Sequence, residues 1–287
     1  MNLKIFLIRV LYDERCNALD MNVERKIDVN TINKRVFRRF MRSLLLSMSC
    51  FFSIMSVSAD TLNIAVASNF VHTLKVLSAD FRKQSGHQSR ISSASTGKLY
   101  TQIQHDAPFD IFLAADEKRP DLLVAEGKAQ PSSAYVYASG QLVFVSNIAP
   151  AETCQKVLTS PDLKRLSIAN PKIAPYGEAA RQVLKNMGLW QQLEPRLVMG
   201  ENIAQTLQFV STRNAQAGFV AKSMLQMSKE IDTACTWNVP ADMYSPIRQK
   251  MVVLKKAKDK IAVQAFLHYM QSVHAKDIIR AAGYDVI

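Results

Sequence analysis

Hydroxyl and amide side chains recur in three loops of the 287-residue chain, each between a short apolar run and a helical pattern. AVASNF places Ser68 and Asn69 at the start of a helix, and SSASTGKL and NPKIAPYGEAA do the same with Thr96 and Tyr176. A helix N-terminus has unpaired N–H groups and a partial positive charge, so such residues can bind an anion. For any single loop ordinary N-capping is the simpler interpretation, whereas three such loops together favour an anion-binding site.

Catalysis by one of these hydroxyls is a weaker alternative. Ser68 and His72 are four residues apart on one expected helix, a spacing that suits a nucleophile and its base in a secreted serine hydrolase. The sequence has no G-x-S-x-G motif and no evident third residue to orient His72. The other histidines are scattered without metal-ligand spacing, and Asp110 and Asp116 are better explained as caps or turns. We therefore expect no enzyme, no cofactor and no metal ion bound directly by side chains.

The elements that must position these loops alternate between strand and helix. Apolar periodicity predicts strands at 62–66, 88–93, 110–114, 166–169, 217–220 and 248–254, and helices from 71 to near 86 and at 98–104, 120–126, 177–187, 204–211 and 261–273. A longer β-rich run, 135–146, is interrupted by Ser139-Gly140, a suitable place for the chain to pass between domains. This alternation predicts an α/β protein with two lobes of about 100 residues each, in which helices cover parallel or mixed sheets.

The N-terminal sequence predicts export. Three arginines precede an uncharged stretch of fifteen residues, Ser43–Val57, and small residues follow it up to Ala59. This pattern is typical of a secretory signal peptide cleaved after Ala59, and a membrane anchor would need about 20 apolar residues. Because a signal peptide begins near its basic residues, we expect residues 1–40 to be an over-extended reading frame outside the fold. Residues 41–59 would then be the signal peptide of a periplasmic protein.

The net charge raises the possibility of an anionic partner. The chain has 36 Lys+Arg and 24 Asp+Glu, a formal charge of +12. Residues 1–59 contain ten of those basic and five of those acidic side chains, which leaves +7 on residues 60–287. That charge is scattered, and its one cluster, KKAKDK at 255–260, has no interleaved aromatic residues, so nucleic-acid binding is not expected. A hydrophobic fraction of 48% and a charged fraction of 21% exclude wholesale disorder and a multi-span membrane protein.

The cysteines favour one disulfide. Cys16 and Cys50 precede the expected cleavage site, which leaves Cys154 and Cys235 in the exported part. An even pair in an oxidising compartment suggests that the two are bonded to each other. Two buried free thiols remain the alternative, while the lack of a CxxC motif or a nearby histidine argues against zinc.

Several segments in combination resemble the periplasmic molybdate-binding proteins of ABC transporters: AVASNF, SSASTGKLYTQI, APFDIFLAAD, IANPKIAPYGEAARQVL, GENIAQTLQFV, AGFVAKS and YSPIRQKMVVL. The resemblance extends from about residue 62 to 284. It implies a two-lobed periplasmic binding protein of type II, in which each lobe is a mixed sheet flanked by helices and the ligand binds in the cleft between the lobes. The two expected crossings, near Ser139-Gly140 and near Pro246, would divide the chain into lobe I (60–139), lobe II (140–246) and a return to lobe I (247–287).

The resemblance also implies that uncharged groups hold molybdate or tungstate as a tetrahedral dianion, namely Ser68, Asn69 by its backbone N–H or side chain, Thr96, Tyr176 by its hydroxyl or N–H, and Ile203 by its N–H. Thr96 departs from the family, which usually has serine at this position. One branch of the family has a tyrosine where this sequence has Ala221. Tyr176, in the APYG loop, is expected to supply the hydroxyl from the opposite side.

A binding site made only of hydrogen-bond donors would discriminate between oxyanions that carry a proton and those that do not. A set of hydrogen-bond donors without a carboxylate acceptor favours an oxyanion that has no proton to give, and phosphate can carry one. Another oxyanion, such as sulfate or phosphate, is the alternative ligand within the same class of protein. The resemblance further implies delivery to the membrane permease of an ABC importer, and we expect a monomer.

Overall fold

The computed structural model describes residues 60–150, 152–227 and 232–286, all of which belong to one compact unit, Val57–Ile287. The expected signal peptide at 41–59 and the extension at 1–40, with Cys16 and Cys50, lie outside the described residues. Within the described part of the chain, no helix is long and apolar enough to cross a bilayer.

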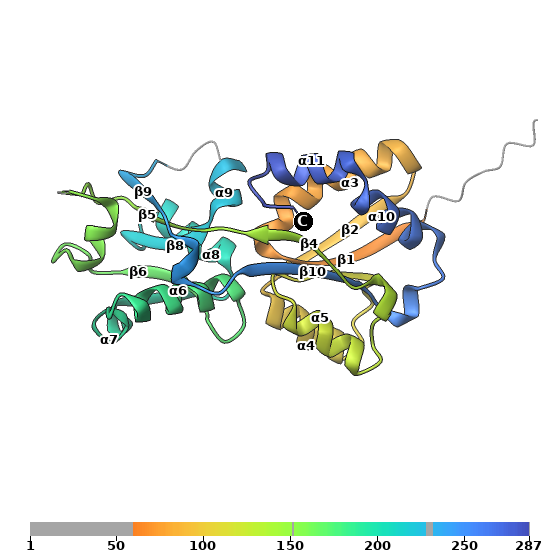
Figure 1. The fold of residues 1–287 in the computed structure, drawn as a ribbon, viewed down its shortest axis with the longest axis horizontal. Helices are drawn as coiled ribbons and strands as arrows, with labels where there is room; N and C mark the ends of the chain where they lie inside the picture. Colours follow the sequence, from red (N-terminus) through yellow and green to blue (C-terminus); the bar gives the residue numbers. More distant parts are fainter. Residues whose placement is uncertain (1–59, 151, 228–231, 287) are drawn as a thin grey trace, which may run out of the picture. The chain divides into compact units, whose positions relative to one another are not determined.

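The first of two sheets is mixed, with five strands in the order β2-β1-β3-β10-β4 (Figure 1). Its strands are β1 (Thr61–Ala67), β2 (Gln88–Ala94), β3 (Ile111–Leu113), β4 (Tyr135–Gly140) and β10 (Ile247–Val253). β1 pairs in parallel with β2 and β3, and β10 pairs antiparallel with β3 and β4. The last four residues of β1 are all buried, as expected for a sheet covered on both faces.

Five helices cover this sheet and form lobe I with it. They are α3 (Val71–Ser85), α4 (Thr96–Gln104), α5 (Lys118–Ala125), α10 (Ile261–Gln271) and α11 (Val273–Ala281). Figure 1 shows α3, α10 and α11 on one side of the sheet and α4 and α5 on the other. Two apolar clusters match this division, because Leu74, Phe81 and Phe266 belong to one cluster and Leu99 and Leu123 to the other.

The second sheet is also mixed and five-stranded, in the order β7-β6-β8-β5-β9, and forms lobe II. Its strands are β5 (Leu142–Ser146), β6 (Leu166–Ala169), β7 (Leu197–Gly200), β8 (Ala217–Ala221) and β9 (Cys235–Asn238). β6 pairs in parallel with β7 and β8, and β5 pairs antiparallel with β8 and β9. The helices of lobe II are α6 (Pro175–Asn186), α7 (Trp190–Leu193), α8 (Ile203–Ser211) and α9 (Lys222–Met227).

The chain passes between the two sheets twice. The first passage is at Gln141, between β4, which ends at Gly140, and β5, which begins at Leu142. The second lies between β9 and β10, which begins at Ile247. Lobe I is therefore discontinuous in sequence, and the strand that completes its sheet comes from the C-terminal part of the chain.

Local sequence explains several helix ends. Gly86 adopts a left-handed conformation with φ 76° and donates its N–H to the Arg82 carbonyl, which ends α3. The helix expected at 261–273 is present as α10 but ends at Gln271, because Ser272 separates it from a second helix, α11. The extended backbone of Ser272 breaks the helix, and its side chain accepts the N–H of Ala275 and so caps α11. Strands β7 and β9 and helices α7, α9 and α11 are additional to the elements expected from sequence.

Candidate anion-binding site

The predicted site residues follow parallel strands in both lobes. Ser68 and Asn69 lie in η1 (Ser68–Phe70), directly after β1, and Thr96 is the first residue of α4, after β2. β1 and β2 pair in parallel up to Ala67 and Ala94, so these residues share one edge of the first sheet.

The arrangement is repeated in lobe II. Tyr176 lies in the first turn of α6, after β6, and Ile203 is the first residue of α8, after β7. β6 and β7 also pair in parallel to their ends. Each lobe thus presents two helix starts side by side at the carboxyl ends of its strands, where open α/β sheets bind ligands.

Contacts between the lobes bring these four loops together. η1 packs against α8 and α9 of lobe II. The Gly97 N–H, next to Thr96, donates to the Ile173 carbonyl in the third loop over 2.9 Å. All five predicted residues are buried, with exposed fractions of at most 4%. The structure therefore encloses them between the lobes.

A groove between the lobes borders this region without including it. Its lining contains Asp116, Arg119 and Arg248 of lobe I and Lys172 and Glu178 of lobe II, with Ala174 and Pro175 at the start of α6. Charged residues thus line the groove, whereas the enclosed site is lined by neutral ones. Arg119 Nη2 also donates to the Lys172 carbonyl over 3.1 Å, a further bond between the lobes.

The predicted donors differ in how much hydrogen-bonding capacity they retain. Thr96 Oγ1 accepts the Ala115 N–H over 3.1 Å, which leaves its own hydrogen to donate. Asn69 Nδ2 donates to Gln249 Oε1 over 2.9 Å and to the Tyr284 hydroxyl over 3.1 Å. Both amide hydrogens of Asn69 are therefore engaged within the protein, which makes its backbone N–H the better candidate for an anion.

The structure adds a buried polar network that the sequence prediction missed. Gln249 Oε1 accepts the Tyr137 hydroxyl over 3.1 Å as well as Asn69, and Gln249 Nε2 donates to the Tyr176 hydroxyl over 3.3 Å. The Tyr284 hydroxyl donates to the Asn69 carbonyl over 2.8 Å and accepts from Ser223 of lobe II over 2.9 Å. The sequence does not single out Gln249, which stands between Arg248 and Lys250 in β10.

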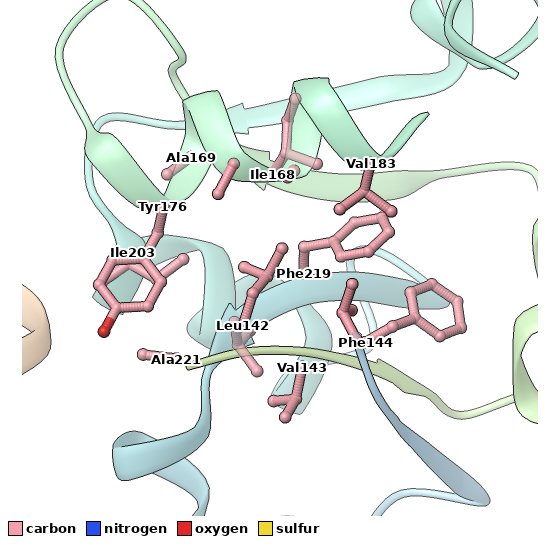
Figure 2. Packing of buried hydrophobic residues seen from close by; sticks show 14 of the residues in the cluster. Leu142, Val143, Phe144, Ile168, Ala169, Tyr176, Val183, Ile203, Phe219 and Ala221 are labelled. Carbon is pink, nitrogen blue, oxygen red and sulfur yellow. The ribbon is translucent and has the colours of Figure 1, made fainter. Parts of the chain in front are cut away.

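Tyr176 lies at the edge of an apolar cluster. Figure 2 shows its ring beside Ile203 and its hydroxyl pointing away from Phe144 and Phe219. Burial raises the pKa of Tyr176 well above its usual value, and the nearby Tyr284, Tyr137 and Tyr244 add to the increase. Its hydroxyl therefore stays protonated and keeps a hydrogen to donate.

The residues considered for a serine hydrolase, Ser68 and His72, differ in their exposure to solvent. Ser68 is buried and His72 is exposed, and within the described residues no hydrogen bond joins them. Asp110 accepts the Asn63 N–H and pairs with Lys260. The described ranges also contain no group of three His, Cys, Asp or Glu side chains placed to hold a metal ion.

Cys154 and Cys235 form a disulfide with a Cα–Cα distance of 5.6 Å. It joins η3 (Cys154–Thr159) to the edge strand β9. Both cysteines therefore belong to lobe II, and the bond does not restrict movement between the lobes.

Comparison with known proteins identifies the family. The sequence model of the family described as bacterial extracellular solute-binding protein matches residues 62–285. The molybdate-binding protein ModA of Azotobacter vinelandii is 43% identical over 230 residues, which cover 80% of this chain and 91% of that protein. ModA of Rhodobacter capsulatus is 42% identical over 221 residues, which cover 77% of this chain and 86% of that protein.

A solved structure agrees with these sequence matches. The periplasmic molybdate-binding protein of Azotobacter vinelandii superposes with a TM-score of 0.73 at 37% identity, covering 79% of this chain and 99% of that one. Both lobes therefore have the type II periplasmic binding fold that the sequence predicts. The chain belongs to the bacterial extracellular solute-binding proteins, and it is similar in sequence and fold to their molybdate-binding members.

Proposed function

We propose that this protein captures molybdate, and also tungstate, as a dianion outside the cytoplasm and delivers it to the permease of an ABC transporter. The observation that carries the proposal is the meeting of four helix starts with uncharged donors at one buried place, in a chain 43% identical to a molybdate-binding protein. Helix N-termini attract negative charge without a basic side chain.

Each predicted residue has a role as a donor. We assign the hydroxyls of Ser68, Thr96 and Tyr176 and the backbone N–H groups of Asn69 and Ile203 to the oxygens of the anion. The two lobes contribute donors from opposite sides, which suits a tetrahedral ligand. The anion is held and released without any covalent change.

Selectivity follows from the chemistry of this set. None of the assigned groups is a carboxylate, so an oxyanion that still carries a proton finds no acceptor for it. Phosphate near neutral pH carries such a proton, and molybdate does not. Sulfate is also unprotonated, so the size of the enclosure must separate it from the larger molybdate.

Capture requires the lobes to open and close. The described conformation has bonds between the lobes, including Gly97 to Ile173, Ser223 to Tyr284, and the ion pair of Lys98 with Glu201 at 3.2 Å. A buried ligand can enter only when such bonds open, and rotation about the two passages between the sheets is the simplest movement. Closure then completes the set of donors around the anion.

The family is extracellular, which supports export of this chain. We propose that residues 41–59 direct export and are cleaved after Ala59, and that the mature protein is a monomer. N-terminal sequencing of the exported protein tests the cleavage site, and a terminus far from Asp60 would contradict it. Size-exclusion chromatography with light scattering tests the monomer.

Titration calorimetry with molybdate, tungstate, sulfate and phosphate tests the ligand. We expect tight binding of the first two and much weaker binding of the others. Ser68→Ala and Tyr176→Phe are each expected to weaken molybdate binding by about 1–3 kcal/mol, because one oxygen of the anion loses its donor. Sulfate binding as tightly as molybdate would contradict selection by size. No binding of any oxyanion would refute the proposed function.

A further inference from the structure

Gln249 is a fully buried polar residue that has no assigned role in ligand capture. It lies in β10 beside an irregularity in the pairing with β4, where Gln249 opposes Ala138 but Lys250 opposes Val136. Tyr137 is the extra residue between them. Bulges of this kind re-aim side chains and are frequent near functional sites, and here the Tyr137 hydroxyl lies 3.1 Å from Gln249 Oε1.

The surroundings of the Gln249 amide determine its orientation. Asn69 Nδ2, which can only donate, lies 2.9 Å from Oε1, and the hydrogen of the Tyr137 hydroxyl is shared between Oε1 at 3.1 Å and the Ala114 carbonyl at 3.2 Å. The amide nitrogen must therefore face the other way, where it lies 3.3 Å from the Tyr176 hydroxyl. An amide nitrogen can only donate, so the Tyr176 oxygen accepts from Gln249.

This geometry leaves one role for the Tyr176 hydroxyl. Its oxygen accepts from Gln249, and among the described residues no acceptor takes its hydrogen. The hydrogen is therefore left for a ligand. Without the Gln249 donor, the hydroxyl could rotate and present a lone pair instead.

We propose that Gln249 is a positioning residue that fixes Tyr176 as a hydrogen donor towards the bound anion and thereby helps the site to reject protonated oxyanions. The inference rests on the proposed function and extends it to a residue outside the predicted donor set. Gln249 connects the lobes in this role, because it belongs to lobe I and Tyr176 to lobe II.

A double-mutant cycle with Gln249→Met and Tyr176→Phe tests the proposal. We expect Gln249→Met alone to raise the Kd for molybdate about ten-fold, and less than about two-fold in the Tyr176→Phe background, because the hydroxyl that it positions is then absent. We also expect the ratio of phosphate Kd to molybdate Kd to fall in Gln249→Met. Gln264→Met, at an exposed glutamine of α10, is the control for the type of substitution.

A milder variant keeps the test decisive if Gln249→Met does not fold. Tyr137→Phe removes the hydroxyl whose hydrogen is shared between Gln249 Oε1 and the Ala114 carbonyl. It should raise the Kd about two- to three-fold in the parent and leave it unchanged in the Tyr176→Phe background. Thermal unfolding of the ligand-free variants shows which of them are folded.

The outcomes separate this inference from the proposed function. Equal losses in both backgrounds, or no loss from Gln249→Met, would overturn the positioning role while the parent protein still binds molybdate. If the parent prefers sulfate, the same cycle is run with sulfate, and only the choice of ligand has failed. A parent that binds none of the four oxyanions would overturn the proposed function and this inference together.

Discussion

The α-carbon of Gly140 lies directly against the hydroxyl of Tyr176. A β-carbon at position 140 would stand 2.0 Å from that oxygen and 2.8 Å from Gln249 Nε2. Gly140 is the last residue of β4, immediately before the chain passes into lobe II. The absence of a side chain at this passage is therefore what allows the Gln249–Tyr176 hydrogen bond to form.

Gly140→Ala should displace the Tyr176 hydroxyl and weaken ligand binding. The added methyl group cannot share the space, so either the ring or the strand must move, at a cost of about 1–3 kcal/mol. Calorimetry should show the loss in molybdate affinity. Ser139→Ala is the matched control, since the bonds of Ser139 to Asp285 are made by its backbone and should survive. Equal affinity in Gly140→Ala and the parent would contradict the close contact.

Thr96→Ala should reduce both ligand affinity and stability. The substitution removes a donor to the anion and also leaves the buried Ala115 N–H without its acceptor, each with an effect of about 1–3 kcal/mol. Calorimetry measures the first effect and urea unfolding of the ligand-free protein the second. Thr96→Ser keeps the hydroxyl and should retain most of both. If Thr96→Ser is as weak as Thr96→Ala, the methyl group rather than the hydroxyl matters.

Ser223→Ala should make the closed conformation less stable than the open one. The Ser223 hydroxyl donates across the lobes to Tyr284 over 2.9 Å, a bond present only when the lobes meet. Molybdate affinity should fall by about 1 kcal/mol, mainly through faster dissociation, while unfolding of the ligand-free protein changes little. Ser211→Ala on the exposed face of α8 is the control. Slower association with unchanged dissociation would contradict this account.

Removal of the disulfide should lower stability without changing ligand affinity. The bond joins cysteines 81 residues apart, and a loop of that length contributes about 4 kcal/mol in the chain-entropy model. Cys154→Ser/Cys235→Ser should therefore unfold at a lower urea concentration than the oxidised parent. The reduced parent should behave like the double variant. Because both cysteines lie in lobe II, the Kd for molybdate should stay the same, and a large change in Kd would show coupling to the site.

Stability should decrease at alkaline pH. Burial raises the pKa values of Tyr137 and Tyr176 well above the ordinary value of 10.0. Above about pH 10 the unfolded chain releases these protons while the folded protein keeps them, so stability is full below that pH and falls as pH rises further. Urea unfolding between about pH 9 and 11 measures the fall. Tyr176→Phe removes one such group and should show a weaker pH dependence, whereas an unchanged slope would contradict burial of its hydroxyl.

Helices and strands could be predicted from sequence where residues close together in the chain determine where they begin and end. The N-cap of α8 is an example, since the Asn202 side chain accepts the N–H groups of Ala204 and Gln205 close to where a helix start is expected. Ser272 is a local capping residue of the same kind. Because the apolar periodicity continues past it, the end of α10 at Gln271 was not expected from the sequence. The placement of Thr96 and Tyr176 at helix starts was predictable for the same local reason.

The Gln249 network could not be predicted, because it joins residues far apart in the chain. Gln249 is 180 residues from Asn69 and 112 from Tyr137, and the separations follow from the return of β10 to the first sheet. The two Asn69 amide hydrogens are engaged by Gln249 of this strand and by Tyr284, which is 215 residues from Asn69. Sequence alone therefore left the side chain and the backbone of Asn69 as equal candidates.

The position of β10 also constrains the order in which the protein can be assembled. Because β10 lies between β3 and β4, lobe I lacks an internal strand until residues 247–253 have been synthesised. Lobe II is built from one continuous segment and can complete its sheet first. Until then β3, which already pairs with β1, and β4 each present an unpaired edge, and such edges are prone to aggregation. The two edges are closed only when β10 pairs with both strands.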